Sequence, residues 1–338
     1  MPYDAFLLVS FGGPEGPEDV VPFLENVTRG RGIPRERLAE VGEHYYRFGG
    51  VSPINQQCRD LLAAVGEDFA ANGVDLPLYW GNRNWDPYLT DTVAKMRDDG
   101  VRHAVAFVTS AYSSISSCRQ YLDDIARARE AAGPDAPVID KLRPFYDHPG
   151  FIEPLAEHTR AALAELPEGV RDRARLVFTA HSIPISMARS SGPQGGAYER
   201  QLAEAARLVA ERVDGGAHPY ELVYQSRSGP PQVPWLEPDV LDRLTALNAE
   251  GTPAVVLVPV GFVSDHMEVK FDLDVEAREL AEKLGMPLSR AAAPGTHPEF
   301  VRMVRRLILE RDGGERLALG TLPPHPEVCP VDCCRIGR

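Results

Sequence analysis

Lysine is nearly missing from this sequence, which has four lysines against 32 arginines. Acidic residues outnumber basic ones, and the formal net charge is −13 at pH 7. A charge of this sign argues against a surface that binds nucleic acid or an anionic membrane. The lack of lysine accompanies many alanines and prolines, a combination that indicates a GC-rich genome rather than a functional adaptation.

Long apolar runs are also missing. No stretch approaches the ~20 apolar residues that a membrane-spanning helix needs. The first residues, M-P-Y-D-A-F-L-L-V-S, lack the basic region and the cleavage site of a signal peptide. We therefore expect a cytoplasmic protein without integral membrane insertion. Its 338 residues, 43% of them hydrophobic, are enough for two domains with a sizeable core each.

Cysteine is scarce and unevenly placed. Cys58 and Cys118 stand alone, whereas Cys329, Cys333 and Cys334 lie within the last ten residues. Structural disulfides are not expected in a cytoplasmic chain, and core packing does not explain three thiols in a proline-rich tail. Two interpretations stay open: the last three thiols and Cys118 ligate a metal or iron–sulfur centre, or the tail is an unligated, disordered end, because C-x3-C-C is not a standard ligand spacing.

What the sequence does contain is an alternation of strand and helix patterns, which predicts a parallel, doubly wound α/β fold. The breaker-rich segment R-P-F-Y-D-H-P-G-F marks a boundary. We therefore expect an N-terminal lobe over 1–145, a C-terminal lobe over 146–315 and a cysteine-containing tail over 316–338. The strands are expected at residues 5–10, 77–80, 104–109, 138–141, 175–180, 221–225 and 255–260.

The two halves resemble each other at an offset of about 151 residues. Internal similarity at domain length predicts two like lobes, with their strand-end loops lining a cleft. The matching features are W-D-P-Y with W-L-E-P-D-V, Gly100 with Gly251, and Ser113 with Ser264.

The segment from Val258 to Asp274 concentrates chemically active side chains. A β-branched run, Val255 to Val260, ends at Gly261, and ligands of parallel α/β sheets bind at the carboxyl ends of strands. The segment therefore predicts a metal or proton-transfer site or, alternatively, the polar start of a helix. The side chains concerned are Asp265, His266, Glu268, Asp272 and Asp274.

His181 follows another predicted strand, L-V-F-T-A, at the corresponding end. A lone histidine is more often structural than a ligand, but this placement would bring His181 near residues 265–268. An imidazole and the carboxylate of Glu268 suit Fe(II) or another divalent metal, and they also suit proton acceptance.

Two glycine-rich loops and one hydroxyl-rich loop complete the set of candidate binding segments. F-G-G-P-E-G-P after the first strand is not the dinucleotide fingerprint, so no nucleotide cofactor is expected. F-G-G-V-S-P-I-N lies at 48–55 and, taken alone, is better interpreted as a plain connection. S-A-Y-S-S-I-S-S-C-R-Q-Y, at 110–121, offers donors to anionic groups.

Five motifs, which span nearly the whole chain, together resemble the ferrochelatase family. The resemblance implies two Rossmann-like lobes with parallel sheets, the chelatase fold, around a central porphyrin cleft. It also implies insertion of Fe(II), as substrate, into a tetrapyrrole. The motifs are F-G-G-P-E at 11–15, G-G-V-S-P at 49–53, T-A-H-S-I-P at 179–184, Q-S-R-S-G-P at 225–230 with P-W-L-E-P at 234–238, and G-F-V-S-D-H-M-E-V-K-F-D-L-D at 261–274.

By this resemblance, His181 corresponds to the family's metal and proton residue and Glu268 to its acidic partner. His266, Asp272 and Asp274 correspond to an inner line of residues that passes protons out or metal in.

The resemblance also assigns porphyrin contacts. Ser52, Tyr121 and Ser113 fall where relatives hold the propionates, and the nearby Arg29 and Arg31 are further candidates. Phe11 stands where some relatives carry a tyrosine that approaches the metal. His44 and Tyr45 replace an Arg-Tyr pair.

The expected reaction is insertion of Fe(II) into coproporphyrin III to give coprohaem in haem biosynthesis. The short, polar approach through residues 43–47 and the actinobacterial composition favour this substrate over protoporphyrin IX, which is the first alternative. A cobalt chelatase of the sirohydrochlorin type and a non-catalytic tetrapyrrole carrier are the others. Expected partners are coproporphyrin III, Fe(II) and, in transient contacts, neighbouring haem-pathway enzymes.

Some ferrochelatases carry a 2Fe-2S cluster on three C-terminal cysteines and one internal thiol. The resemblance therefore implies Cys118, Cys329, Cys333 and Cys334 as its ligands here. Adjacent Cys333 and Cys334 would need a local turn, because neighbouring side chains of an extended segment point apart.

Overall fold

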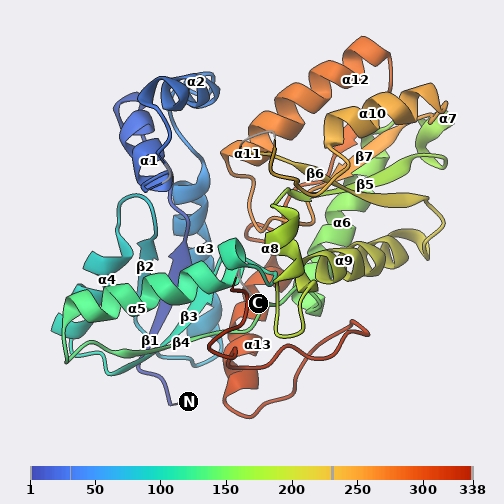
Figure 1. The fold of residues 1–338 in the computed structure, drawn as a ribbon. Helices are drawn as coiled ribbons and strands as arrows, with labels where there is room; N and C mark the ends of the chain where they lie inside the picture. The colour runs from blue at the N-terminus through green and yellow to red at the C-terminus, as the bar shows by residue number, and fades with distance from the viewer. Residues whose placement is uncertain (1, 31, 230–231, 336–338) are drawn as a thin grey trace. The chain divides into compact units, whose positions relative to one another are not determined.

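The computed structural model describes residues 2–30, 32–229 and 232–335. They form an α/β fold with two four-stranded parallel sheets, which confirms the predicted fold class (Figure 1). Within these ranges, no helix combines the length and the apolar character needed to cross a membrane.

The chain divides into two compact units. The first contains the chain up to Thr109, together with Gln120–Leu142 and Arg311–Gly313. The second contains Ser110–Arg119, Arg143–Glu310 and the chain from Gly314 onward. The hydroxyl-rich loop up to Arg119 and the cysteine-containing tail therefore belong to the same unit.

The sheet of the first unit has the strand order β2-β1-β3-β4. Central β1 is buried at all six positions, because it has a strand on either side and helices over both faces. A parallel strand in this environment is apolar throughout rather than alternating, which is the pattern of A-F-L-L-V-S. The strands are β1 (Ala5–Ser10), β2 (Leu78–Asn82), β3 (His103–Val108) and β4 (Val138–Lys141).

Successive residues of β1 point to opposite faces of the sheet, and each face has its own helices. Leu7 packs into the core made with α4 and α5, whereas Phe6 meets Phe69 of α3 edge to face at 5.5 Å. A smaller cluster around Phe23 joins α1 to α2. The helices of this unit are α1 (Val20–Val27), α2 (Arg35–Tyr46), α3 (Ile54–Ala71), α4 (Leu89–Asp98) and α5 (Gln120–Ala132), and the short η1 (Pro17–Asp19) precedes α1.

The sheet of the second unit has the order β6-β5-β7-β8, which repeats the topology of the first sheet. α10 and the helical segment from α11 to α12 pack on one face, and α6 and α9 pack together and contact the strands. The strands are β5 (Arg175–His181), β6 (Tyr220–Gln225), β7 (Val255–Val258) and β8 (Leu288–Arg290). The helical segments are η2 (Ile115–Arg119), α6 (Pro149–Glu165), α7 (Glu168–Arg171), α8 (Ile185–Arg189), α9 (Ala197–Asp214), α10 (Val240–Ala249), α11 (Met267–Val269), η3 (Lys270–Ala277), α12 (Arg278–Leu284) and α13 (Pro298–Arg311).

β7 ends at Val258, two residues before the predicted end. Pro259 has no N–H with which to continue the strand ladder. Gly261 then passes so close to β5 that an added Cβ would lie 2.6 Å from the Cβ of Ala180. Only glycine permits this approach, which brings the chain after Gly261 toward the carboxyl end of β5.

Candidate active site

His181 is the last residue of β5, and Gln225 is its partner at the end of neighbouring β6. The His181 Nδ1 atom lies 2.5 Å from the main-chain oxygen of Ser182. A carbonyl oxygen only accepts, so Nδ1 carries the proton, and Nε2 is the nitrogen left for chemistry. Nε2 lies 3.6 Å from the Oε1 atom of Glu268, in α11.

The two side chains shift each other's pKa in opposite directions. Burial alone would lower the pKa of His181, but the charge and the hydrogen bond of Glu268 outweigh it and raise the pKa to about 9. Burial alone would raise the pKa of Glu268, but the charge of His181 outweighs it and lowers the pKa to about 2. At neutral pH, His181 is therefore an imidazolium and Glu268 a carboxylate.

His266 caps the helix that carries Glu268. Its Nδ1 atom accepts a hydrogen bond from the main-chain N–H of Glu268 at 3.2 Å, and its ring meets Phe262 edge to face at 5.0 Å. Burial and the neighbouring charge of His181 lower the pKa of His266, despite the opposing charge of Glu268. His266 is therefore a neutral residue that fixes the start of α11.

Asp272 lies one turn beyond Glu268, in the π-helical segment η3. Such segments are frequent at functional sites. Its Oδ2 atom accepts hydrogen bonds from Ser226 Oγ and from Gln225 Nε2, the latter at 3.2 Å. Burial, helped by the charge of Glu268 and opposed by the Ser226 hydrogen bond, raises the pKa of Asp272 to about 7.

Asp274 does not join these residues but pairs with Arg290 of β8. The guanidinium donates from Nε at 2.6 Å and from Nη2 at 3.0 Å to the two Asp274 oxygens. Asp265 accepts from the same guanidinium. Both carboxylates thus anchor the segment around Glu268 to the sheet, because a guanidinium fork fixes two oxygens at once.

The first unit contains most of the predicted porphyrin contacts. Phe11 and Tyr45 both pack on Phe23, with ring centroids 6.2 and 5.9 Å apart. The guanidinium of Arg83 lies 4.7 Å from the ring centroid of Tyr121 and 5.8 Å from that of Phe11. Arg83 therefore joins two predicted contacts, although the sequence did not single it out. Its place just after β2, at a strand end, was the available signal.

Ser52 and Ser113 are both buried, in different units. The main-chain N–H of Ser52 donates to the carbonyl of Pro14 at 2.8 Å, which joins the two glycine-rich loops. Ser113 is bound by Gln201, which accepts from its N–H at 2.8 Å and donates to its Oγ at 3.0 Å. Arg31, a further expected contact, lies outside the described residues.

The four cysteines expected to act together do converge within the second unit. Cys333 and Cys334 Sγ are 3.6 Å apart, and Cys334 has a φ of 61°, which supplies the required local turn. Hydrogen bonds from the Cys118 and Cys333 thiols, and from His325, lower the pKa of Cys329 against the opposing effect of burial. Among the described residues, however, no three or more His, Cys, Asp or Glu side chains form a group that could hold a metal ion.

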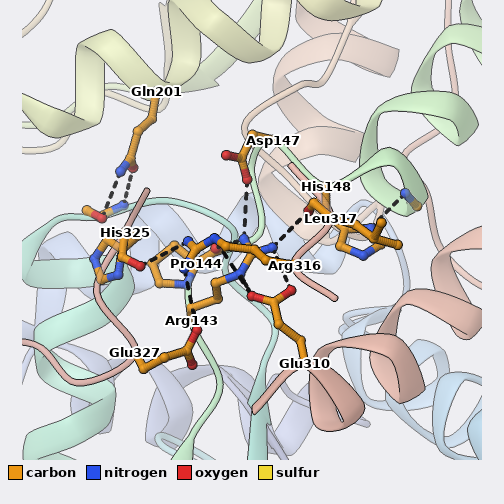
Figure 2. A network of polar contacts seen from close by, with 12 residues as sticks. Arg143, Pro144, Asp147, His148, Gln201, Glu310, Arg316, Leu317, His325 and Glu327 are labelled. Atoms are coloured by element: carbon orange, nitrogen blue, oxygen red, sulfur yellow. Dashed lines mark hydrogen bonds and ion pairs between the residues drawn. The ribbon is translucent and has the colours of Figure 1, made fainter. Parts of the chain in front are cut away.

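A buried polar network holds the tail that carries three of these cysteines (Figure 2). Arg143 donates to both oxygens of Glu310, at 2.6 and 3.0 Å, and to the carbonyl of Leu317 at 2.9 Å. Arg316 donates to the carbonyl of His325 at 2.9 Å. Farther along, Arg119 donates to the carbonyl of Val331 at 2.8 Å. The described part of the tail is therefore bonded to the rest of the second unit at Leu317 and at Val331.

Comparisons with known proteins agree with this arrangement. The family model described as ferrochelatase matches residues 3–312. The coproporphyrin III ferrochelatase of Streptomyces coelicolor is 57% identical over 350 residues, covering 98% of this chain and 93% of its own. The ferrochelatase of Rhodopirellula baltica is 54% identical over 336 residues, with the same coverages of 98% and 93%.

The likeness to solved structures concerns the fold. SirB from Bacillus subtilis, solved with Fe3+, superposes with a TM-score of 0.57 at 13% identity and covers 91% of this chain and 97% of its own. The chain thus combines two parallel sheets of repeated topology, a histidine at the end of β5 paired with a glutamate in α11, and a family match over residues 3–312. The chain belongs to the ferrochelatase family.

Proposed function

We propose that this protein is a cytoplasmic enzyme that inserts Fe(II) into coproporphyrin III to give coprohaem, a step of haem biosynthesis. The observation that carries the proposal is the His181–Glu268 pair, with Nε2 3.6 Å from Oε1. A nitrogen base and a carboxylate at one point suit both partners of the reaction, the metal ion and the leaving protons. The name of the Streptomyces coelicolor relative supports the choice of porphyrin.

The bond from Nδ1 to the Ser182 carbonyl determines how His181 acts. With Nδ1 protonated, the neutral imidazole presents the lone pair of Nε2 toward the reacting centre. The approach of a doubly charged ion favours transfer of the Nε2 proton to solvent water, which reaches the 32% exposed side chain, because two cationic groups repel each other at close range. The deprotonated Nε2 then accepts a proton from a pyrrole nitrogen, while the Glu268 carboxylate stabilises the incoming charge.

Insertion releases two protons from the pyrrole nitrogens, and the His181 imidazole can accept only one of them at a time. Asp272 is the second acceptor, because its pKa of about 7 allows it to take up and release a proton near neutral pH. The amide of Gln225 connects Asp272 to the residue that pairs with His181. Its Nε2 atom is 3.4 Å from the Glu268 carbonyl and 3.2 Å from Asp272 Oδ2. Protons would leave the site along this side of η3.

We further propose that Ser52, Arg83 and Tyr121 contact porphyrin propionates, and that Phe11 and Tyr45 contact the ring. Arg83 supplies the cation that a carboxylate requires, although it is already paired with Asp124. Transient contacts with neighbouring enzymes of the pathway would deliver the porphyrin and remove coprohaem.

Anaerobic loss of porphyrin fluorescence tests the reaction. Coproporphyrin III and protoporphyrin IX are each mixed with Fe(II) or Co(II), and sirohydrochlorin with Co(II) is run in parallel. We expect the fastest turnover for coproporphyrin III with Fe(II). Equal or faster turnover of protoporphyrin IX would change the substrate, preferred turnover of sirohydrochlorin with Co(II) would indicate the cobalt chelatase, and tight porphyrin binding without turnover would indicate a carrier.

We also propose that Cys118, Cys329, Cys333 and Cys334 ligate a 2Fe-2S cluster. The donor set fits the group, because such a cluster takes four thiolates, two on each iron, and does not need three ligands around one ion. The cluster would supply a redox-active, iron-dependent link between the tail and η2. The residues themselves already bring the tail to η2 through the hydrogen bond between Cys118 and Cys329.

A further inference from the structure

A cavity of about 230 Å³ lies within the second unit and shares no lining residue with the His181–Glu268 pair. Its walls come from the start of α9 and from tail residues 322–326. Most of the lining is apolar, with a few polar side chains directed to one space. Small-molecule sites have this composition, and the volume limits the ligand to a small one.

Tyr146 contributes a hydrogen-bond donor that has no partner. Its side chain is 1% exposed and lines the cavity, and its hydroxyl makes no hydrogen bond with any residue that the structure describes. Burial, together with the charges of Asp147 and Glu204, raises the pKa of Tyr146, so the hydroxyl keeps its proton. The hydroxyl reaches the space of the cavity, where a ligand oxygen would accept its hydrogen bond.

Arg200 gives the cavity a positive charge. Its Nη2 atom donates to the carbonyl of Gly195 at 2.6 Å, which holds the guanidinium at the start of α9. No aspartate or glutamate is among the described residues that line the cavity. Two further polar side chains of the lining, Gln201 and His325, are already engaged (Figure 2). Gln201 binds Ser113, and His325 lies 2.8 Å from the Pro326 carbonyl and 3.8 Å from Cys329 Sγ. Gln194 adds an exposed amide.

The remaining lining determines the rest of the ligand. Pro193, Pro323, Pro324 and Pro326 have no N–H donor and add apolar ring surface that is exposed to solvent. A flat apolar ring gains from contact with such surface, because the contact removes both from water. We infer that this cavity binds a small aromatic carboxylate, whose ring lies against the prolines and whose carboxylate accepts hydrogen bonds from Tyr146 and Arg200.

Ligand-observed NMR on the full chain tests this inference, with benzoate as the probe. Acetate provides the charge without the ring, and benzyl alcohol provides the ring without the charge. Tyr146→Phe removes only the hydroxyl, and Arg200→Gln removes only the charge. Arg173→Gln is the matched control, because Arg173 is exposed and donates to the carbonyl of Gly169 in the preceding α7.

We expect saturation transfer to benzoate, with a dissociation constant at least about ten-fold lower than for acetate or benzyl alcohol. Each of the two cavity variants should weaken benzoate binding about ten-fold, as loss of one hydrogen bond to a charged group does. Arg173→Gln should bind as the wild type does. Coproporphyrin III should not displace the probe, and iron insertion by Tyr146→Phe should proceed at the wild-type rate.

Four results would overturn the inference: no transfer to benzoate at millimolar concentration, equal binding by the wild type and both cavity variants, equal binding of benzyl alcohol, or displacement by coproporphyrin III. The experiment measures benzoate binding directly. Its result is therefore independent of whether the protein inserts iron into a porphyrin. Circular dichroism checks the fold of each variant, and Arg200→Gln, an exposed change, decides the question if Tyr146→Phe is unstable.

Discussion

His181 and Glu268 come from the ends of different strand–helix units, and Nε2 of the first lies 3.6 Å from Oε1 of the second. Each side chain stabilises the charged form of the other, which is why the pKa values move apart to about 9 and about 2. Two titratable groups separated in this way are suited to complementary roles. The predictions below begin from this pair.

His181→Ala removes the proton acceptor and leaves the neighbouring side chains Glu268, His266 and Asp272 unchanged. We expect insertion of iron to fall by at least about 10²-fold, the usual contribution of a general base. Porphyrin binding, followed by fluorescence titration, should change little. Wild-type-like turnover by this variant would contradict the assignment of His181.

Glu268→Gln keeps the shape of the side chain and removes its charge. The pKa of His181 should then fall below about 9, because the Glu268 charge is the largest influence that raises it. Histidine NMR signals followed from pH 5 to 10 measure this shift, and insertion should fall strongly in the same variant. A changed melting temperature with unchanged turnover would mean that Glu268 serves only the helix start.

The same pair should make stability depend on pH. The His181 contribution is fully present below pH 6.5, the ordinary pKa of a histidine in an unfolded chain, and is lost as pH rises through about 9. Because the side chains are 32% and 47% exposed, solvent screening keeps the contribution below about 1 kcal/mol. Urea unfolding at pH 6 and pH 9.5, with His181→Ala as reference, measures it. An identical pH dependence in both proteins would speak against the ion pair.

Asp272→Asn should change stability in the opposite sense. The folded protein holds the Asp272 proton until about pH 7, whereas the unfolded chain releases it near 3.8. Stability therefore falls as pH rises between these values. Asparagine has no proton to lose, so the variant should gain about 3 kcal/mol relative to the wild type between pH 4.5 and pH 8. Urea unfolding of both proteins at the two pH values measures this gain. An equal difference in unfolding free energy at pH 4.5 and pH 8 would contradict the prediction.

Glu310→Gln breaks the buried pair that anchors the tail. The side chains of Arg143 and Glu310 are 2% and 5% exposed. Because Arg143 keeps its ion pair with Asp147, loss of the Glu310 charge should cost about 1.5–3 kcal/mol, as for hydrogen bonds to a charged group. Arg302→Gln, also on α13, removes one partner of a pair that is 44% and 34% exposed and should cost less than about 1 kcal/mol. Similar unfolding midpoints for the two variants would show that burial does not set the strength of the Arg143 pair.

The thiols provide the test of the cluster. Anaerobically purified protein should contain about two irons and two sulfides per chain and absorb visible light. Cys329→Ser should lose both, whereas Cys58→Ser, in α3 and outside the thiol group, should retain them. Iron-free protein with the four thiols open to alkylation would leave the tail without a cluster.

The sequence by itself determined the fold class, the family and the pair of residues at the strand ends. Apolar strands alternating with helices require a parallel sheet, and a parallel sheet collects its strand-end side chains at one edge. His181 and Glu268 could therefore be predicted, because their placement follows from local pattern and topology.

Only the tertiary structure decided the partners of the other side chains. Asp274 and Asp272 are two residues apart in sequence, yet Asp274 binds Arg290 and Asp272 binds Ser226. Arg83 became a candidate only when it was found beside Tyr121, and the turn at Cys334 appeared only in its backbone. These contacts join residues from distant parts of the chain, and their geometry depends on how helices and loops pack, which no local periodicity records.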